Sequence, residues 1–157
     1  MTRLKMAIIF CILFISVAQA QRRDYDPFEH ANGAMTVLTG WSVGSIVVGT
    51  GMLFVPNTQV KYAGVQNIAW GAIDMGIAVW GKNSTRKNIG YKPPDQQRKE
   101  FQKALWINGL LDIAYIGVGY YLYAHGKNDK LKGTGAGIMV QGGFLFVFDW
   151  ANFALTL

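Results

Sequence analysis

Four long runs of apolar residues, separated by polar segments, make up most of the chain after residue 30. The runs cover residues 31–55, 62–80, 104–124 and 137–157. Each is about long enough to cross a hydrocarbon layer of about 30 Å as a helix, at about 1.5 Å per residue. None carries a row of charged residues, which a soluble amphipathic helix would turn toward water. The pattern predicts an all-α, polytopic membrane protein: an up-down-up-down four-helix transmembrane bundle. A buried bundle in a soluble protein is the competing interpretation, but it would leave no polar face for water.

The polar segments differ in length. Residues 55–61 and 126–133 are short turns, whereas residues 81–103 are longer and strongly basic. Within the long segment, Pro93, Pro94 and Asp95 predict the start of a helix, with Asp95 as its N-cap. We therefore divide the chain after its leader into a hairpin at 28–82, a basic loop at 83–102 and a second hairpin at 103–157.

The first 20 residues have the three-part pattern of a secretory signal peptide. Arg3 and Lys5 form a basic start, residues 6–17 an apolar middle, and Ala18-Gln19-Ala20 a small-residue cleavage site. This pattern predicts cleavage after Ala20. The alternative is that the leader is retained as a fifth helix, although its apolar run is short for a membrane span.

The two pairs of runs share residues at an almost constant offset, which indicates an internal duplication. The matching pairs are Val65 with Val140, Gln66 with Gln141, Asp74 with Asp149, Asn32 with Asn108, Gly33 with Gly109, Thr36 with Asp112 and Gly51 with Gly126. A repeat of two membrane-spanning helices returns the chain to its starting side, so the two hairpins would be parallel. A pseudo-twofold axis along the membrane normal would relate them.

Three aspartates interrupt runs that contain no Lys or Arg. Asp74, Asp112 and Asp149 each lie on a different predicted helix. A charged residue at the centre of such a helix costs about 2.5–3.5 kcal/mol, so these side chains should face the bundle interior or water. Apolar surroundings and neighbouring carboxylates both disfavour the charged form, and we expect at least one of the three to be protonated at neutral pH.

Amide and hydroxyl side chains on the same predicted helices are the expected partners of these carboxyl groups. The predicted intramembrane polar cluster consists of Asp74, Asp112, Asp149, Asn32, Thr36, Gln66, Asn67, Asn108, Gln141 and Asn152, with His30 at its mouth. From its positions along the helices, the cluster should lie in the half of the membrane nearer the basic loop. On the first predicted helix, Gly33, Gly40, Gly44 and Gly51 form a small-residue stripe, which favours close helix packing.

The amino-acid composition limits the kinds of functional site that we expect in this chain. The only cysteine, Cys11, lies in the leader, and the chain has two histidines, His30 and His125. Disulfides, zinc–thiolate centres and histidine-rich metal centres are therefore not expected. The chain has no nucleophile–base pair, metalloprotease motif or dinucleotide fingerprint, so we expect neither an enzyme nor a cofactor.

The formal net charge is +6, and the basic residues lie between the apolar runs. Membrane lipids are the natural partners of that charge, rather than nucleic acid. An acidic partner of residues 82–103 and a protein partner or second copy at the glycine faces are further options. A cleaved leader would place the basic loop outside, whereas the positive-inside rule would place it in the cytoplasm. The expected location is the bacterial inner membrane, and the orientation stays open.

The sequence supports two functional hypotheses. One is a structural or partner-binding membrane component, in which the polar cluster joins helices through hydrogen bonds. The other is a proton- or cation-coupled carrier or channel that uses Asp74, Asp112 and Asp149.

Overall fold

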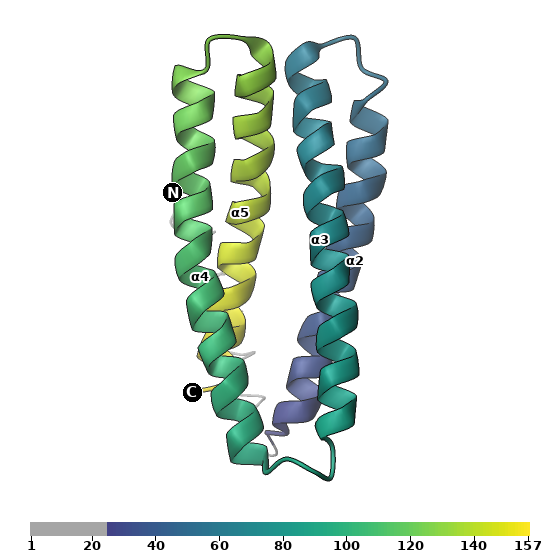
Figure 1. Ribbon diagram of the computed structural model, residues 1–157, viewed down its shortest axis with the longest axis vertical. Coiled ribbons are helices and arrows are strands. Elements are labelled where there is room, and N and C mark those ends of the chain that lie inside the picture. The colour runs from purple at the N-terminus through teal and green to yellow at the C-terminus, as the bar shows by residue number, and fades with distance from the viewer. Residues whose placement is uncertain (1–24) are drawn as a thin grey trace, which may run out of the picture.

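The structure, a computed structural model, describes residues 25–157 and is helical throughout apart from short links. Its helices are α2 (Pro27–Met52), α3 (Thr58–Asn88), α4 (Pro94–His125) and α5 (Asp129–Leu155). The chain reverses direction at each link, so that sequence neighbours run antiparallel (Figure 1). The all-helical expectation is confirmed. The predicted signal peptide, residues 1–20, lies outside the described residues.

Three of the four helices, α2, α4 and α5, are long and apolar enough to cross a membrane. We expected four such helices, and α3 is the exception, although it has 31 residues. Gln66, Asn67 and Asp74 interrupt its apolar run, and its last turns contain Lys82 and Arg86. Helix α3 is therefore long enough to span but more polar than its neighbours.

Local capping explains where the helices begin. Asp26 accepts hydrogen bonds from the backbone N–H groups of Phe28, at 2.7 Å, and Glu29, at 3.2 Å. Asn57 and Asn128 cap α3 and α5 in the same way. Such bonds satisfy N–H groups that have no partner within the helix. Helix α4 begins at Pro94 without a side-chain cap. The prediction that Asp95 is the N-cap was therefore wrong, because Asp95 lies inside the first turn.

The predicted basic loop at 83–102 is mostly helical. Residues 83–88 continue α3, residues 94–102 belong to α4, and only residues 89–93 link the two helices. The start of α4 agrees with the helix start predicted from Pro93, Pro94 and Asp95, whereas the continuation of α3 to Asn88 was not expected from the apolar pattern. The turn itself uses Gly90, whose φ is +79°, a conformation that favours glycine.

Helix α2 packs along α3, α4 packs along α5, and the two hairpins meet mainly through α3 and α5. Helices α2 and α4 also make contact, and large side chains bridge α2 to α5 and α3 to α4. We call these two interfaces the α2–α5 seam and the α3–α4 seam.

Glycines allow the packed pairs to approach, but they are not the predicted ones. A Cβ added at Gly49 would lie 2.6 Å from the carbonyl oxygen of Gly64, and one at Gly135 would lie 2.5 Å from that of Gly119. Within residues 25–157 the predicted stripe packs against nothing: added Cβ atoms at Gly33, Gly40, Gly44 and Gly51 would meet no described atom within 4 Å. The face of α2 that is buried instead carries Ala31, Ala34, Leu38, Ser42, Ser45 and Gly49.

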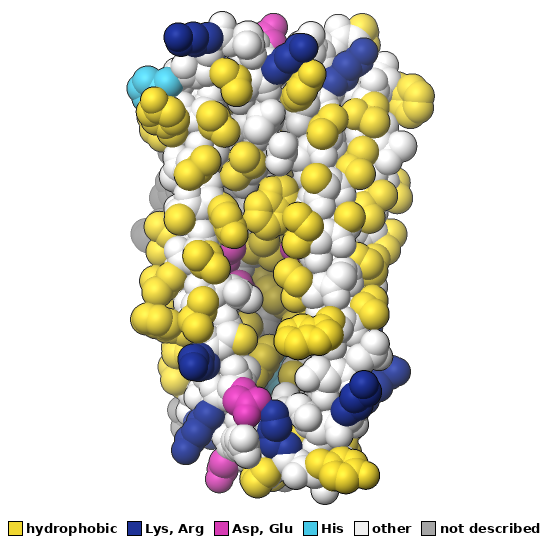
Figure 2. Space-filling model, in the orientation of Figure 1, with side chains coloured by type: hydrophobic (Ala, Val, Ile, Leu, Met, Phe, Trp, Pro, Cys, Tyr) yellow, Lys and Arg dark blue, Asp and Glu magenta, His cyan; other side chains and the backbone are white. Residues whose placement is uncertain are grey.

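Apolar side chains cover much of the visible surface between two ends where Lys and Arg gather (Figure 2). Large hydrophobic residues are well exposed on every helix; Val47, for example, is 64% exposed and Tyr121 63%. The apolar core is small by comparison and centres on Ala34, Leu38, Ala78 and Phe148. An apolar girdle between two charged rims is the distribution that a lipid environment favours.

Candidate functional site

Three aspartates from three helices converge on one cavity. Asp74 of α3, Asp112 of α4 and Asp149 of α5 are 1%, 2% and 4% exposed. All three line a cavity of about 310 Å³ at the α3–α4 seam, together with Asn108. Figure 2 looks onto this seam and shows a hollow between the helices with acidic side chains about midway along.

The carboxyl groups lie close enough to influence one another. The side chains of Asp112 and Asp149 are within hydrogen-bonding reach, the charge of Asp112 acts on Asp74, and the charge of Asp74 acts on Asp149. No Lys or Arg from residues 25–157 lines the cavity. Two carboxyl groups can form a hydrogen bond only when one of them carries a proton, because two bare carboxylates repel each other. The pair Asp112–Asp149 is therefore suited to share a proton.

Two carboxylate oxygens in this site have no partner. Oδ2 of Asp74 and Oδ2 of Asp112 are buried and form no hydrogen bond. An unpaired polar atom away from water costs about 1–3 kcal/mol, and more when it is charged. Such atoms in a buried site call for an explanation, which can be a ligand that supplies the missing donor.

The rest of the cavity wall is apolar and aromatic. The rings of Trp70 and Tyr115 meet edge to face, with 4.9 Å between their centroids, and bridge α3 and α4. Phe101, Phe148 and Trp80 also line the cavity. Aromatic faces attract cations, and apolar walls strengthen any charge interaction inside.

Packing on α3 explains why Asp74 points inward. Asn67, Gly71, Asp74 and Ala78 form its buried stripe. A Cβ at Gly71 would lie 2.9 Å from the carbonyl oxygen of Ser42, so α2 and α3 are in close contact one turn from Asp74. Asp74 lies on the same stripe and lines the cavity together with residues of α4 and α5.

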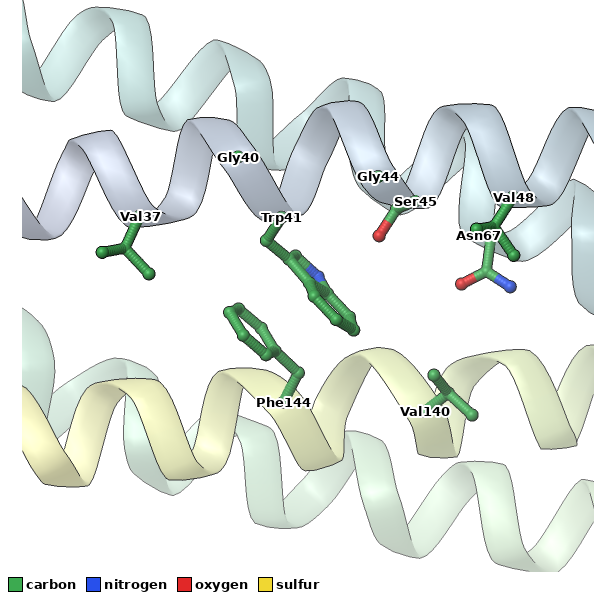
Figure 3. A pocket seen from close by; sticks show the side chains of 9 residues that line it. All are labelled: Val37, Gly40, Trp41, Gly44, Ser45, Val48, Asn67, Val140 and Phe144. Atoms are coloured by element: carbon green, nitrogen blue, oxygen red, sulfur yellow. The ribbon is translucent and has the colours of Figure 1, made fainter. Parts of the chain in front are cut away.

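A second polar group lies at the α2–α5 seam and is fully paired. Gln141 of α5 is 0% exposed. Its Oε1 accepts a hydrogen bond from Trp41 Nε1 at 2.8 Å, and its Nε2 donates to Ser45 Oγ at 3.2 Å and to Asn67 Oδ1. These bonds join α2, α3 and α5. Figure 3 shows Trp41 and Phe144 facing each other beside Ser45 and Asn67, in a groove of about 470 Å³.

Residues 37–150 match the model of a family described as "Family of unknown function (DUF6992)". The chain belongs to this family. No curated protein and no solved structure matches the chain. The matched range contains all three aspartates of the cavity and the whole Gln141 network. It ends before Asn152 and begins after His30 and Asn32.

His30 joins three helices at the end of the bundle nearer the α3–α4 link. Asn152 donates its amide hydrogen to the carbonyl oxygen of Phe148, which leaves Asn152 Oδ1 to accept a hydrogen bond from His30 Nε2 at 3.0 Å. His30 Nδ1 then accepts from the Tyr25 hydroxyl at 3.1 Å. Phe101 of α4 packs edge-on against the imidazole. These contacts fit a neutral imidazole that orients helix ends.

The remaining predicted members do not form one cluster. Thr36 is exposed, and its hydroxyl donates to the Asn32 carbonyl oxygen of its own helix at 2.9 Å. Gln66 is half-buried beside Gly137, far along α3 from Asp74. Oδ1 of Asn32 is buried without a partner. The single predicted cluster is therefore divided into the aspartate cavity, the Gln141 network and the His30–Asn152 pair, and three members, Asn32, Thr36 and Gln66, belong to none of these groups.

Sequence reasoning missed Trp41, Ser45 and Trp70. Trp41 and Ser45 complete the Gln141 network, and Trp70 forms a cavity wall. Each lies in an apolar run where tryptophan and serine are ordinary residues. The only clue was spacing: Trp41 and Ser45 are four residues apart, so they share a helix face.

Proposed function

We propose that the protein is a multi-pass integral membrane protein whose aspartate cavity binds protons or a cation, as part of a coupled carrier or channel. The observation that carries the proposal is the pair of buried, unpartnered oxygens on Asp74 and Asp112. A purely structural carboxyl group would have hydrogen-bond partners, since an unpaired one destabilises the fold. Ionisable residues inside membrane helices commonly mark ion or proton pathways.

The membrane setting is supported by three apolar helices and by the girdle between two charged rims. In this proposal all four helices cross the bilayer as two parallel hairpin repeats, and α3 crosses with its polar stripe turned inward. Membrane lipids surround the girdle, the leader is a cleaved signal peptide, and the bacterial inner membrane is the location. No catalytic activity is part of the proposal.

The structural or partner-binding role is the second candidate, and different observations favour it. The Gln141 network joins three helices, as a register-setting group should. Among the described residues, no atom packs against Gly40 or Gly44 on this face of α2. A second copy or another membrane protein could cover this face, and an acidic partner could bind the basic residues between 82 and 103.

Reconstitution distinguishes the two roles. Purified full-length protein is placed in liposomes that contain a pH-sensitive dye, and a potassium gradient with valinomycin drives cation movement. The carrier or channel role predicts proton flux that is lost in Asp112→Asn and Asp149→Asn while the variants still fold and insert. Asp95→Asn, an exposed position outside the cavity, is the matched control and should conduct like the wild type. Absence of wild-type flux, with folding or assembly lost in the variants, would support the structural role instead.

Infrared spectroscopy tests the state of the carboxyl groups directly. At neutral pH the wild type should show the stretching band of a protonated carboxyl group, and the band should weaken in Asp112→Asn or Asp149→Asn. A spectrum in which all three aspartates are ionised would contradict the shared proton.

A further inference from the structure

The aspartate cavity is larger than a proton or a bare metal ion requires. At about 310 Å³ it has room for about ten molecules of liquid water, at about 30 Å³ each. Within residues 25–157, no group of His, Cys, Asp or Glu side chains is arranged to hold a metal ion. A site of this size, lined mostly by apolar side chains, is typical of a small organic ligand.

The polar atoms of the cavity specify the charge of that ligand. Asp74 Oδ2 and Asp112 Oδ2 are acceptors without donors, each on a side chain at most 2% exposed. In the part of the chain that the structure describes, the cavity lining offers no Lys or Arg to pair with them. A ligand that donates N–H groups from a positively charged nitrogen would satisfy both oxygens with charge-assisted hydrogen bonds.

The apolar and aromatic walls of the cavity indicate that the rest of the ligand is apolar. Trp70 and Tyr115 stand beside the carboxyl groups, and Leu105, Leu145 and Phe148 complete the apolar lining. An inorganic cation would leave this apolar surface unfilled. A ligand with an apolar body would cover it, and the aromatic faces would add attraction for its charge.

We propose that the cavity binds a small organic ammonium ion, with its charged nitrogen between Asp74 and Asp112 and its apolar body against Trp70 and Tyr115. This inference rests on the proposed function and names the class of cation that the site takes. Asp149 of α5 lines the same cavity beside these two carboxyl groups.

The surroundings of the cavity suit a ligand that arrives from the membrane. Ile73, Ile77 and Leu111 line it and are 52%, 43% and 46% exposed, so the open side of the α3–α4 seam is apolar. An ammonium ion with an apolar body partitions into a bilayer with its charge near the headgroups. It would reach the carboxyl groups between α3 and α4 without crossing a charged rim.

The test uses full-length protein in detergent micelles with two probes of similar shape. One is 2-phenylethylammonium, which is charged at neutral pH, and the other is 2-phenylethanol, which is not. Isothermal titration calorimetry and quenching of tryptophan fluorescence report binding. The proposal predicts that the ammonium probe binds about ten-fold or more tightly than the alcohol, because only the ammonium carries the charge.

Variants then locate the site. Asp74→Asn should weaken binding of 2-phenylethylammonium by about ten-fold or more while leaving binding of 2-phenylethanol unchanged. Asp95→Asn should bind both probes like the wild type. If Asp74→Asn does not fold, the comparison of the two probes on wild-type protein still decides the proposal.

Equal binding of the two probes, or no binding of either, would overturn the organic-cation site. So would ammonium binding that Asp74→Asn leaves intact. These outcomes are separate from the proposed function, which is judged by proton flux and by the infrared carboxyl band. Proton flux without ammonium binding would indicate a pathway for protons or inorganic ions. Ammonium binding without proton flux would indicate a binding protein rather than a carrier or channel.

Discussion

At both the α2–α5 seam and the α3–α4 seam, large side chains bridge two helices. The two seams differ in how the hydrogen bonds of their polar groups are satisfied. At the α2–α5 seam, Trp41 and Phe144 stack with 3.7 Å between ring centroids, and the Gln141 amide pairs at both ends. At the α3–α4 seam, Asp74 and Asp112 each keep an unpaired oxygen, and a cavity lies beside them.

This difference separates two uses of buried polarity. A neutral amide with every hydrogen bond formed stabilises a particular arrangement of helices. A carboxyl group with a free oxygen destabilises the empty fold and is retained where a ligand or proton completes it. Substitutions at the two seams should therefore affect different properties. Those at the α2–α5 seam should lower the stability of the fold, and those at the α3–α4 seam should weaken binding.

The largest expected loss of stability follows Gln141→Leu. The substitution leaves the Asn67 carbonyl and the Trp41 N–H without their partner and removes the donor to Ser45. We expect the free energy of unfolding to fall by about 3 kcal/mol, at about 1 kcal/mol for each of the bonds lost. Unfolding in mixed detergent micelles, followed by circular dichroism, measures it. If Gln141→Leu lowers the free energy of unfolding no more than Asp74→Asn does, the two seams do not differ in their contribution to stability.

Trp41→Ala should have the next largest effect. It removes the stack with Phe144 and the bond to Gln141, and the side chain is half-buried rather than fully buried. We expect a loss of about 2 kcal/mol, below the roughly 3–5 kcal/mol of a fully buried tryptophan. Trp80→Ala, at a side chain that is 73% exposed, is the control and should change the same unfolding curve much less.

Asp74→Asn should change stability by less than about 1 kcal/mol in the absence of ligand, because the amide keeps the shape and no hydrogen bond of Asp74 is lost. The same variant should lose its response to 2-phenylethylammonium in a thermal-shift measurement. A large loss of stability without any probe would mean that Asp74 is a structural residue like Gln141.

Gly44→Ala should have the smallest effect, a gain of up to about 0.5 kcal/mol, because alanine favours the helix and its Cβ meets no atom within 4 Å. Gly71→Ala is the matched variant and should destabilise, since its Cβ would lie 2.9 Å from a backbone oxygen of α2. A loss of stability or of oligomers in Gly44→Ala, measured by unfolding and by light scattering, would indicate that a partner covers this face of α2.

The apolar runs were enough to predict the helices, because a membrane-length helix requires only length and the absence of charge. They were also enough to predict that Asp74, Asp112 and Asp149 lie inside the bundle, because a carboxyl group that faces lipid is costly. Proline and aspartate at residues 93–95 were enough to predict the start of α4 in the basic segment, but the apolar pattern did not show that α3 continues to Asn88. Helix formation does not depend on apolarity alone.

The tertiary structure alone decided which face of α2 turns inward. A run that is apolar on every side has no polar face to set its rotation, and so the stripe at Gly33, Gly40, Gly44 and Gly51 could not be placed from sequence. Packing between α2 and α3 set that rotation: it turned Thr36 outward and brought Trp41 to Gln141. The same rotations left Asp74 and Asp112 facing a cavity without a donor, because the direction of a side chain depends on every helix that surrounds it.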